Sequence, residues 1–167
     1  MSERRLLGPG FPDDTGKAAP ELSTALSTYA ADASTYPEAL AALQEARLLV
    51  PVVAVLGEVE HDEDGLARDK SSDMAAVLLT GTDGRLALLA FTGTDAMTAW
   101  NPEARPVPVA TRLAAQSALQ EGAAALVIDV AGPVTVVAEG EDLHGLAAGW
   151  TLGRVGRRAA WIRPATE

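Results

Sequence analysis

The side chains in this sequence that could do chemistry are mostly carboxylates, and they are concentrated in residues 57–73. That stretch holds seven acids against two basic residues. Hard cations such as Ca²⁺ prefer clustered carboxylate oxygens. The acids Glu58, Glu60, Asp62 and Asp64 alternate, but the spaced Asp/Asn, central Gly and terminal Glu of a calcium loop are absent. We therefore interpret the stretch as a long, exposed acidic loop and expect no metal site.

The same loop ends in a polar run, Asp-Lys-Ser-Ser-Asp at residues 69–73. Its serines lack the Gly-x-Ser-x-Gly pattern of a nucleophile elbow, and such short polar side chains commonly form caps and turns. Asp69, Lys70 and Asp73 are candidate binding residues. An unrecognised enzyme would use carboxylates such as Asp69, Asp73 and Asp129, and two of these would then have to converge in one concave, water-poor pocket.

Several classes of chemistry are excluded by the residue types themselves. The chain has no cysteine and only two histidines. Thiol nucleophiles, Cys-ligated zinc, iron–sulfur clusters and disulfides are therefore excluded, and two histidines cannot build a His-rich metal site. The stretch 81–84 lacks the Gly-Lys-Ser/Thr ending of a phosphate loop. We expect no catalytic residue and no cofactor, and predict that the protein is not an enzyme.

A second group of residues indicates binding. Trp100, Arg105, Pro106 and Pro108 place an indole, a guanidinium and rigid backbone within nine residues, a mixture common at protein contact patches. The alternating prolines forbid full pairing, which predicts an edge strand at 105–109. A partner segment could add to its unblocked side as a further strand. The alternative is that Trp100 only fills the core beneath the helix that it ends.

The charge of the chain restricts its partners. The formal net charge is −10, with 13 Lys and Arg residues, so the phosphate backbone of a nucleic acid is repelled and no nucleic-acid partner is expected. Arg154, Arg157, Arg158 and Arg163 gather near the C-terminus. We interpret them as a solvated, loosely ordered tail, with a basic contact strip for an acidic partner as the alternative.

The hydrophobic pattern predicts the elements that position these groups. Aromatic residues make up only 4% of the chain, so the core must be built from Ala, Val and Leu. Hairpins mixed with helix–strand units favour an α/β (α+β) fold with a mixed or antiparallel central sheet of about five to six strands and helices packed on it. The predicted helices are 23–33, 37–46, 94–100, 111–121 and 141–149, and the predicted strands are 48–55, 74–79, 86–91, 105–109, 124–130 and 134–138.

The ends of the chain differ in composition from its middle. Residues 1–22 are rich in Gly and Pro with little to bury, which predicts a disordered N-terminal tail. A single domain is expected at 23–163 and a C-terminal tail at 164–167. No apolar signal-peptide core follows the first residues, and no apolar run approaches the ~20 residues that span a bilayer. We expect a cytoplasmic protein without a membrane partner.

Five stretches, in this order, resemble the SseB N-terminal domain family in its actinobacterial form. The resemblance covers roughly residues 35–140. It implies a mixed α/β domain and supplies no catalytic residues that could be carried over. The stretches are RLLVPVV at 47–53, DKSSDM at 69–74, LAFT at 89–92, WNPEARPVPV at 100–109 and DVAGP at 129–133.

Three functions follow from these residues. The first is a non-enzymatic protein-interaction or regulatory module that binds an unknown protein through residues 100–109 and the acidic loop. The alternative is a small-molecule sensor for a metabolite or amino acid, with an apolar pocket near residues 69–73 and the hairpin predicted from strands 74–79 and 86–91. The third is the carboxylate-dependent enzyme described above. An exposed edge strand also favours a homodimer.

Overall fold

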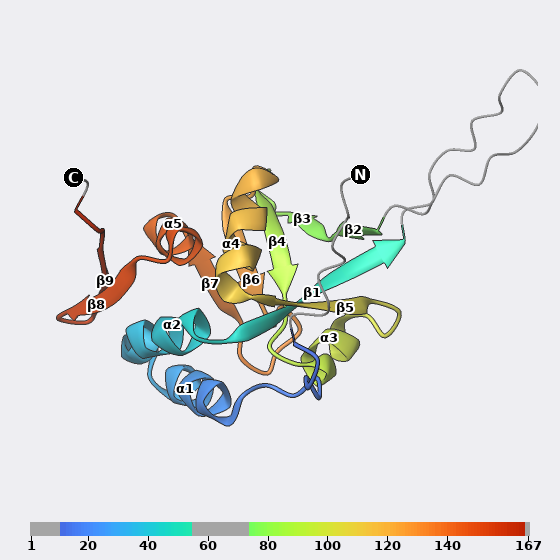
Figure 1. Cartoon of the computed structure of the whole chain (residues 1–167), viewed down its shortest axis with the longest axis horizontal. Helices are drawn as coiled ribbons and strands as arrows, with labels where there is room; N and C mark the ends of the chain where they lie inside the picture. The colour runs from blue at the N-terminus through green and yellow to red at the C-terminus, as the bar shows by residue number, and fades with distance from the viewer. Residues whose placement is uncertain (1–10, 55–73, 166–167) are drawn as a thin grey trace, which may run out of the picture.

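A computed structural model describes residues 11–54 and 74–165 of the chain (Figure 1). This part has an α+β fold, as the sequence predicts, with helices packed on small antiparallel and mixed sheets. The expected acidic loop lies outside the described residues, and so do the candidate binding residues Asp69, Lys70 and Asp73.

The helices begin and end where the local sequence favours it. Pro20 opens α1 and Pro37 lies in the first turn of α2, positions where the fixed φ of proline suits a helix. Gly149 ends α5 in the left-handed conformation, with a φ of 68°. Thr111 does not cap α4 through its side chain, because its hydroxyl donates to the carbonyl of Ala46 at 3.0 Å. The helices are α1 Pro20–Ala31, the short 3₁₀ helix η1 Ala33–Thr35, α2 Tyr36–Gln44, α3 Thr94–Trp100, α4 Thr111–Gln120 and α5 Glu141–Ala148.

The described strands form three small sheets instead of the single central sheet that the sequence predicts. The first has the order β2-β1-β5 and is antiparallel, and the second has the order β3-β4-β6-β7, with β4 and β6 parallel. The third is a hairpin of β8 and β9. The strands are β1 Arg47–Ala54, β2 Met74–Ala76, β3 Leu78–Thr80, β4 Leu86–Ala90, β5 Arg105–Ala110, β6 Ala125–Ile128, β7 Val136–Glu139, β8 Thr151–Val155 and β9 Arg158–Ile162.

The two larger sheets meet at one bridge, between Leu49 of β1 and Phe91, which follows β4. The Leu49 amide donates to the Phe91 carbonyl at 2.7 Å, and the Phe91 amide donates back to the Leu49 carbonyl at 2.8 Å. Two residues further along β1 is Pro51, which has no amide hydrogen to continue this pairing. The bridge therefore stays isolated, and the sheet divides there.

The strand expected at 74–79 is shared between the two sheets. Its first part, β2, pairs with the end of β1, and its second part, β3, forms the predicted hairpin with β4. At Val77, between the two parts, the carbonyl accepts a hydrogen bond from the Leu89 amide at 3.2 Å. Residues 74–80 thus form one edge made of two consecutive strands, and the chain changes partner at Val77 between them.

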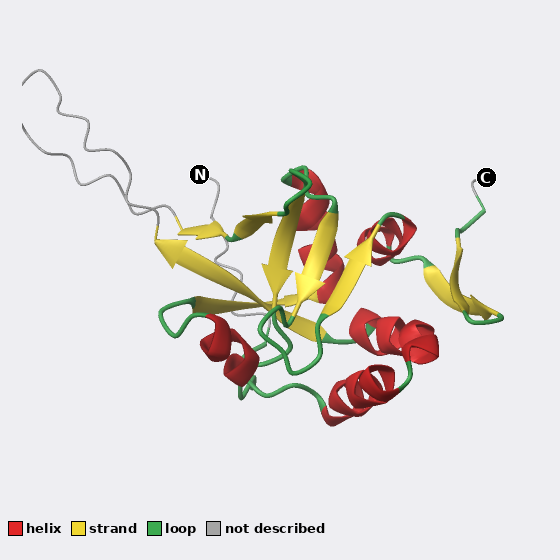
Figure 2. Cartoon of the chain, turned by 180° about the vertical axis from the view of Figure 1, so that it is seen from behind, coloured by secondary structure: helices red, strands yellow, loops and turns green. Residues whose placement is uncertain are grey.

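Helices cover one face of the four-stranded sheet (Figure 2). That face carries Leu88, Leu126 and Ile128, which are fully buried in the larger core beneath α2, α4 and α5. A smaller cluster around Phe91 and Met97 lies on the opposite face, against α3. Because α3 is short, it covers only part of this second face.

The C-terminal arginines do not belong to a loosely ordered tail, since residues 151–162 form the hairpin β8–β9 beside α2 and α5 (Figure 1). Leu152 and Trp161 point to one face of the hairpin and pack against the larger core. The Trp161 indole nitrogen donates to the Asp142 carboxylate at 2.9 Å. Sequence reasoning missed the hairpin because Gly153 and Arg154 interrupt the apolar pattern of β8.

The N-terminal segment also differs from the prediction. Residues 11–22 are expected in a disordered tail, but Asp14 is bound by Arg47 of β1, and α1 already begins at Pro20. Residues 1–10 lie outside the described part. A polar contact holds this segment in place, so its low hydrophobicity gave no sign of the order.

No helix in the described part of the chain is long and apolar enough to cross a membrane.

Candidate functional site

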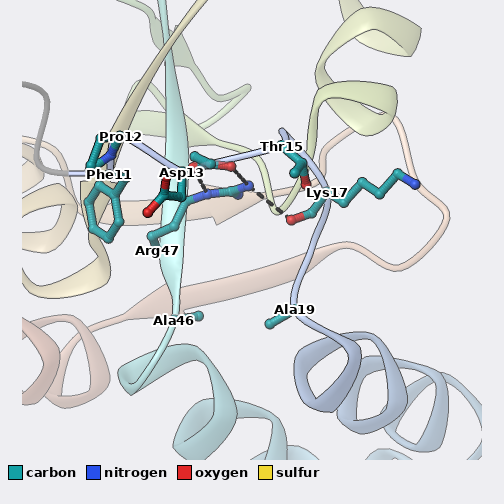
Figure 3. A pocket seen from close by; sticks show the side chains of 9 residues that line it. Phe11, Pro12, Asp13, Thr15, Lys17, Ala19, Ala46 and Arg47 are labelled. Carbon is teal, nitrogen blue, oxygen red and sulfur yellow. Dashed lines mark hydrogen bonds and ion pairs between the residues drawn. The ribbon is translucent and has the colours of Figure 1, made fainter.

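A cavity of about 470 Å³ opens between segment 11–19 and the junction of α2 with β1 (Figure 3). Ala19 and Ala46 lie on opposite sides of it in this view, with Arg47 above them. The volume falls within the ~300–1,000 Å³ typical of small-molecule sites. The lining residues are Phe11, Pro12, Asp13, Asp14, Thr15, Lys17, Ala19, Ala46 and Arg47.

Arg47, the first residue of β1, holds the wall of this cavity together. Its guanidinium binds both carboxylate oxygens of Asp14 and donates to the backbone carbonyls of Lys17, at 2.9 Å, and Thr92, at 2.6 Å. Bidentate arginine–carboxylate pairs are strong and fix orientation. The Arg47 and Asp14 side chains are only 12% and 14% exposed. Arg47 therefore clamps segment 11–19 onto β1 and ties both to the end of β4.

The charge state of Asp14 follows from this contact. The hydrogen bond from Arg47 lowers the pKa of Asp14, and partial burial of the carboxyl, which acts in the opposite direction, does not cancel the effect. A further hydrogen bond from the Gly16 amide, at 2.8 Å, also favours the carboxylate. Asp14 is thus ionised at neutral pH, and its charge is already paired.

Behind Arg47, Asp129 follows β6 and is only 2% exposed. Its two carboxylate oxygens accept hydrogen bonds from the amide of Thr92, at 2.8 Å, and from the Thr92 hydroxyl, at 2.7 Å. Burial raises the pKa of Asp129, although the two hydrogen bonds from Thr92 act against this shift. The backbone is left-handed here, with a φ of 56°, a conformation that Asp tolerates better than most residues.

Thr92 and Asp129 follow the neighbouring parallel strands β4 and β6, at the sheet edge where open α/β sheets commonly bind ligands. Here the two side chains bind each other and fasten two loops together. Every buried side-chain nitrogen and oxygen of the described residues has a hydrogen-bond partner. In residues 11–54 and 74–165, no three His, Asp or Glu side chains gather as a metal site. The network of Arg47, Thr92 and Asp129 therefore acts as a structural brace behind the cavity.

Trp100 ends α3 and is half-buried. Its ring centroid lies 5.6 Å from that of Phe91, and it packs against the smaller core cluster that includes Met97 and Ala104. This is the core-filling arrangement that the sequence left open as an alternative. Trp100 therefore shows only part of its side chain to a partner.

Of the other predicted binding residues, Arg105 and Pro106 are exposed on β5, and Pro108 is half-buried. Val107, between the two prolines, is 41% exposed. The strand is the outer one of its sheet, as the sequence predicts. Arg105 and Val107 therefore lie on one face of β5, the face of Val50 and the larger core, and Pro106 lies on the opposite face, that of Leu49 and the smaller cluster.

The free side of β5 cannot accept a partner strand in the expected way. The amide and carbonyl of Leu49 point to Phe91 and therefore away from β5. In the pairing of β1 with β5, Leu49 lies opposite Pro108. Directly opposite residues of an antiparallel pair either bond to each other or both point away. Pro108 and, two residues earlier, Pro106 therefore occupy the outward positions, and neither has an amide hydrogen to donate. At the two prolines this edge offers a partner only carbonyl oxygens and side chains.

Sequence reasoning missed the Arg47–Asp14 pair. One signal was present, because Arg47 opens a strand that is otherwise apolar, and a charge at such a position needs a partner. The partner itself could not be read from the sequence, since the chain has 23 Asp and Glu residues and Asp14 lies 33 positions away.

Comparison with known proteins gives one match. The family model for the SseB protein N-terminal domain matches residues 22–145, which is most of the chain. No curated protein and no solved structure matches significantly. The cavity segment 11–19 and the hairpin β8–β9 lie outside the matched range.

Proposed function

The chain belongs to the SseB N-terminal domain family, and from this premise we propose that it is a non-enzymatic protein-interaction module. It acts in the cytoplasm, and its partner is a protein rather than a nucleic acid or a membrane. The observation that carries the proposal is the run of three exposed residues, Arg105, Pro106 and Val107, on the outer strand β5.

The chemistry of this run suits protein recognition. Arginine is enriched among the residues that dominate binding energies at interfaces, and here it stands next to an exposed valine. The prolines hold the backbone rigid before binding, so less conformational entropy is lost when a partner binds. Because Pro106 and Pro108 block strand addition, specificity depends on the side chains of the partner.

The non-enzymatic part of the proposal is supported by how the polar residues are used. A catalytic carboxylate must exchange a proton with substrate or be free to attack it. Asp129 is buried, and Thr92 occupies both of its oxygens. Asp14 is likewise held by Arg47. These groups hold loops and strands together instead of facing a substrate.

The test is affinity capture with a double variant, Arg105→Ala with Val107→Ala. We expect the wild-type chain to recover a partner protein from extracts of its own cells and the double variant to recover at least tenfold less. Trp100 is kept, because its removal would also weaken the core. Val155→Ala is the matched control, since Val155 is 71% exposed on β8, which belongs to a different sheet from β5. Equal recovery by the double variant, with an unchanged melting curve, contradicts the proposal.

A second candidate function is the small-molecule sensor, which the 470 Å³ cavity favours. A groove of about 340 Å³ also lies beside the hairpin β3–β4, where the sequence places an apolar pocket. A thermal-shift screen of amino acids and other metabolites tests this candidate. A ligand at 100 times its Kd adds about 2.7 kcal/mol to the free energy of unfolding. Ala19→Leu should narrow the cavity and reduce the shift, and a screen in which no compound raises the midpoint contradicts the sensor.

A further inference from the structure

We propose that two copies of this chain pair through the strand formed by residues 74–80, so that their four-stranded sheets join into one across a two-fold axis. The inference is independent of the proposed function, because it concerns a different edge from that of β5. It rests on the direction of the backbone groups along this strand and on the state of the other sheet edges.

The hydrogen bonds within the molecule show which backbone groups of β3 point outward. The Gly81 amide donates to the Arg85 carbonyl at 2.8 Å, and the Val77 carbonyl accepts from the Leu89 amide. Backbone groups alternate in direction along a strand. The backbone groups of Val77 and Gly81 face β4. The backbone groups of Leu78 and Thr80, at the alternate positions, therefore face away from the sheet.

The same reasoning applies to β2. The amide and carbonyl of Leu49 point away from β5. Val53 lies four residues further along β1, so its amide and carbonyl point to the same side, toward β2. Ala75 lies opposite Val53 and faces inward. The backbone groups of Met74 and Ala76 therefore face outward. Each of the four alternate residues of this edge, Met74, Ala76, Leu78 and Thr80, thus directs one amide and one carbonyl outward, and none of them is proline.

The outer edges at the opposite sides of the two larger sheets are less available. Pro106 and Pro108 remove two of the three outward amides of β5, and Ala110 keeps the third. On β7, the Tyr36 hydroxyl lies 3.0 Å from both the Val137 carbonyl oxygen and an Asp142 carboxylate oxygen, so a side chain stands against this edge. Residues 74–80 read Met-Ala-Ala-Val-Leu-Leu-Thr and carry neither proline nor charge. Natural sheets protect long apolar edges, and within the described residues no other strand pairs with this one on its outer side.

A second copy fits this edge because the edge is self-complementary. A two-fold axis at Val77 places Ala76 opposite Leu78 of the second copy and Met74 opposite Thr80, and each of these four pairs can form two backbone hydrogen bonds. Leu79, which is 38% exposed, then has an apolar strand beside it. Closed two-fold pairing leaves no edge for further growth, so the assembly stops at two copies.

Disulfide trapping tests the register, since the chain has no cysteine of its own. In the pair, Val77 faces its own copy at a non-hydrogen-bonded position, where Cα atoms are ~4.5 Å apart, which suits a disulfide. We expect Val77→Cys to form a covalent dimer on mild oxidation. Leu79→Cys is the control on the same face. In the proposed pair, residue 79 of one copy is four residues, or ~13 Å, along the strand from residue 79 of the other copy. Equal trapping of both variants overturns the proposed pairing.

Sedimentation equilibrium tests the pairing itself. We expect two copies for the wild-type chain and one copy for Ala76→Pro, which removes an outward amide and no internal hydrogen bond. Ala110→Pro is the matched control, because its φ of −61° suits proline and its amide faces outward on β5, at the other side of the molecule's β2-β1-β5 sheet; it should sediment as two copies. Thr80→Pro replaces Ala76→Pro if that variant does not fold. A wild-type chain that sediments as one copy at every concentration overturns the proposal and leaves the edge to a strand of another protein.

Discussion

The indole ring of Trp161 lies against the backbone of Gly145, where no larger residue fits. A Cβ atom on Gly145 would come closer to three ring carbons of Trp161 than Cβ atoms come to any neighbour in real proteins. Gly145 is inside α5, where glycine destabilises a helix by ~1 kcal/mol relative to alanine. The close contact docks the hairpin β8–β9 on α5, so packing outweighs helix propensity at this position.

Gly145→Ala should therefore destabilise the protein by about 1–3 kcal/mol, the usual range for overpacking, although helix propensity alone predicts a gain. Urea unfolding followed by Trp fluorescence measures the change. The double variant Gly145→Ala with Trp161→Ala provides the control. Without the indole, the added methyl group should stabilise relative to Trp161→Ala alone. A destabilising effect of the same size in both backgrounds would show that the contact with Trp161 is not its cause.

Asp129→Asn should change the free energy of unfolding at pH 7 by less than about 1 kcal/mol, because Asn keeps an oxygen for the Thr92 amide and tolerates a left-handed backbone. Asp129→Ala should cost about 2–4 kcal/mol, since it leaves the amide and hydroxyl of Thr92 without partners. Chemical denaturation of both variants measures the difference. A loss of less than about 1 kcal/mol for Asp129→Ala as well would mean that the Thr92 hydrogen bonds contribute little.

The raised pKa of Asp129 also predicts a pH dependence. The folded chain holds the proton more firmly than the unfolded chain, so stability falls as pH rises from about 4, the unfolded pKa, through the raised folded pKa. Asp129→Asn lacks this ionisation. We expect the stability of the wild-type chain relative to Asp129→Asn to decline with rising pH in that window, as measured by urea unfolding at a series of pH values.

Asp14 should show the opposite sign. Its folded pKa is lowered, so its contribution to stability is present above the unfolded pKa of about 4 and is lost as pH falls through the folded pKa. The stability advantage of the wild-type chain over Asp14→Asn should be constant from neutral pH to about pH 5 and should shrink in more acid solution. Asp13→Asn, which alters the exposed neighbouring carboxylate, is the control. A difference that is independent of pH would show that the Arg47 pair does not shift the pKa of Asp14.

Trp100→Ala should destabilise the protein by about 2–4 kcal/mol, because it removes a large ring from the contact with Phe91. Arg105→Ala, at an exposed position five residues later, should change stability by less than about 0.5 kcal/mol. Thermal unfolding of the two variants separates these expectations. An unchanged melting temperature for Trp100→Ala would place the indole at the surface instead of in the smaller core cluster.

Local sequence patterns were sufficient to predict most of the individual elements and the fold class. Helices α2 to α5, the hairpin β3–β4 and the outer position of β5 follow from apolar spacing and from proline and glycine, because these signals act on residues close together in the chain. The Asp-Gly pair at the hairpin turn is one example, since Gly84 adopts a positive φ of 81°. The residue types alone exclude thiol and disulfide chemistry, because the chain has no cysteine.

The way these elements meet became clear only from the folded chain. Residue spacing did not indicate that Arg47 pairs with Asp14, that Thr92 binds Asp129, or that the sheet divides after Leu49, because each contact joins residues more than thirty positions apart. The directions of the Pro106 and Pro108 backbone groups depend on the register with β1. Long-range pairing is set by the packing of the whole chain, and local patterns carry too little information to select one partner among many.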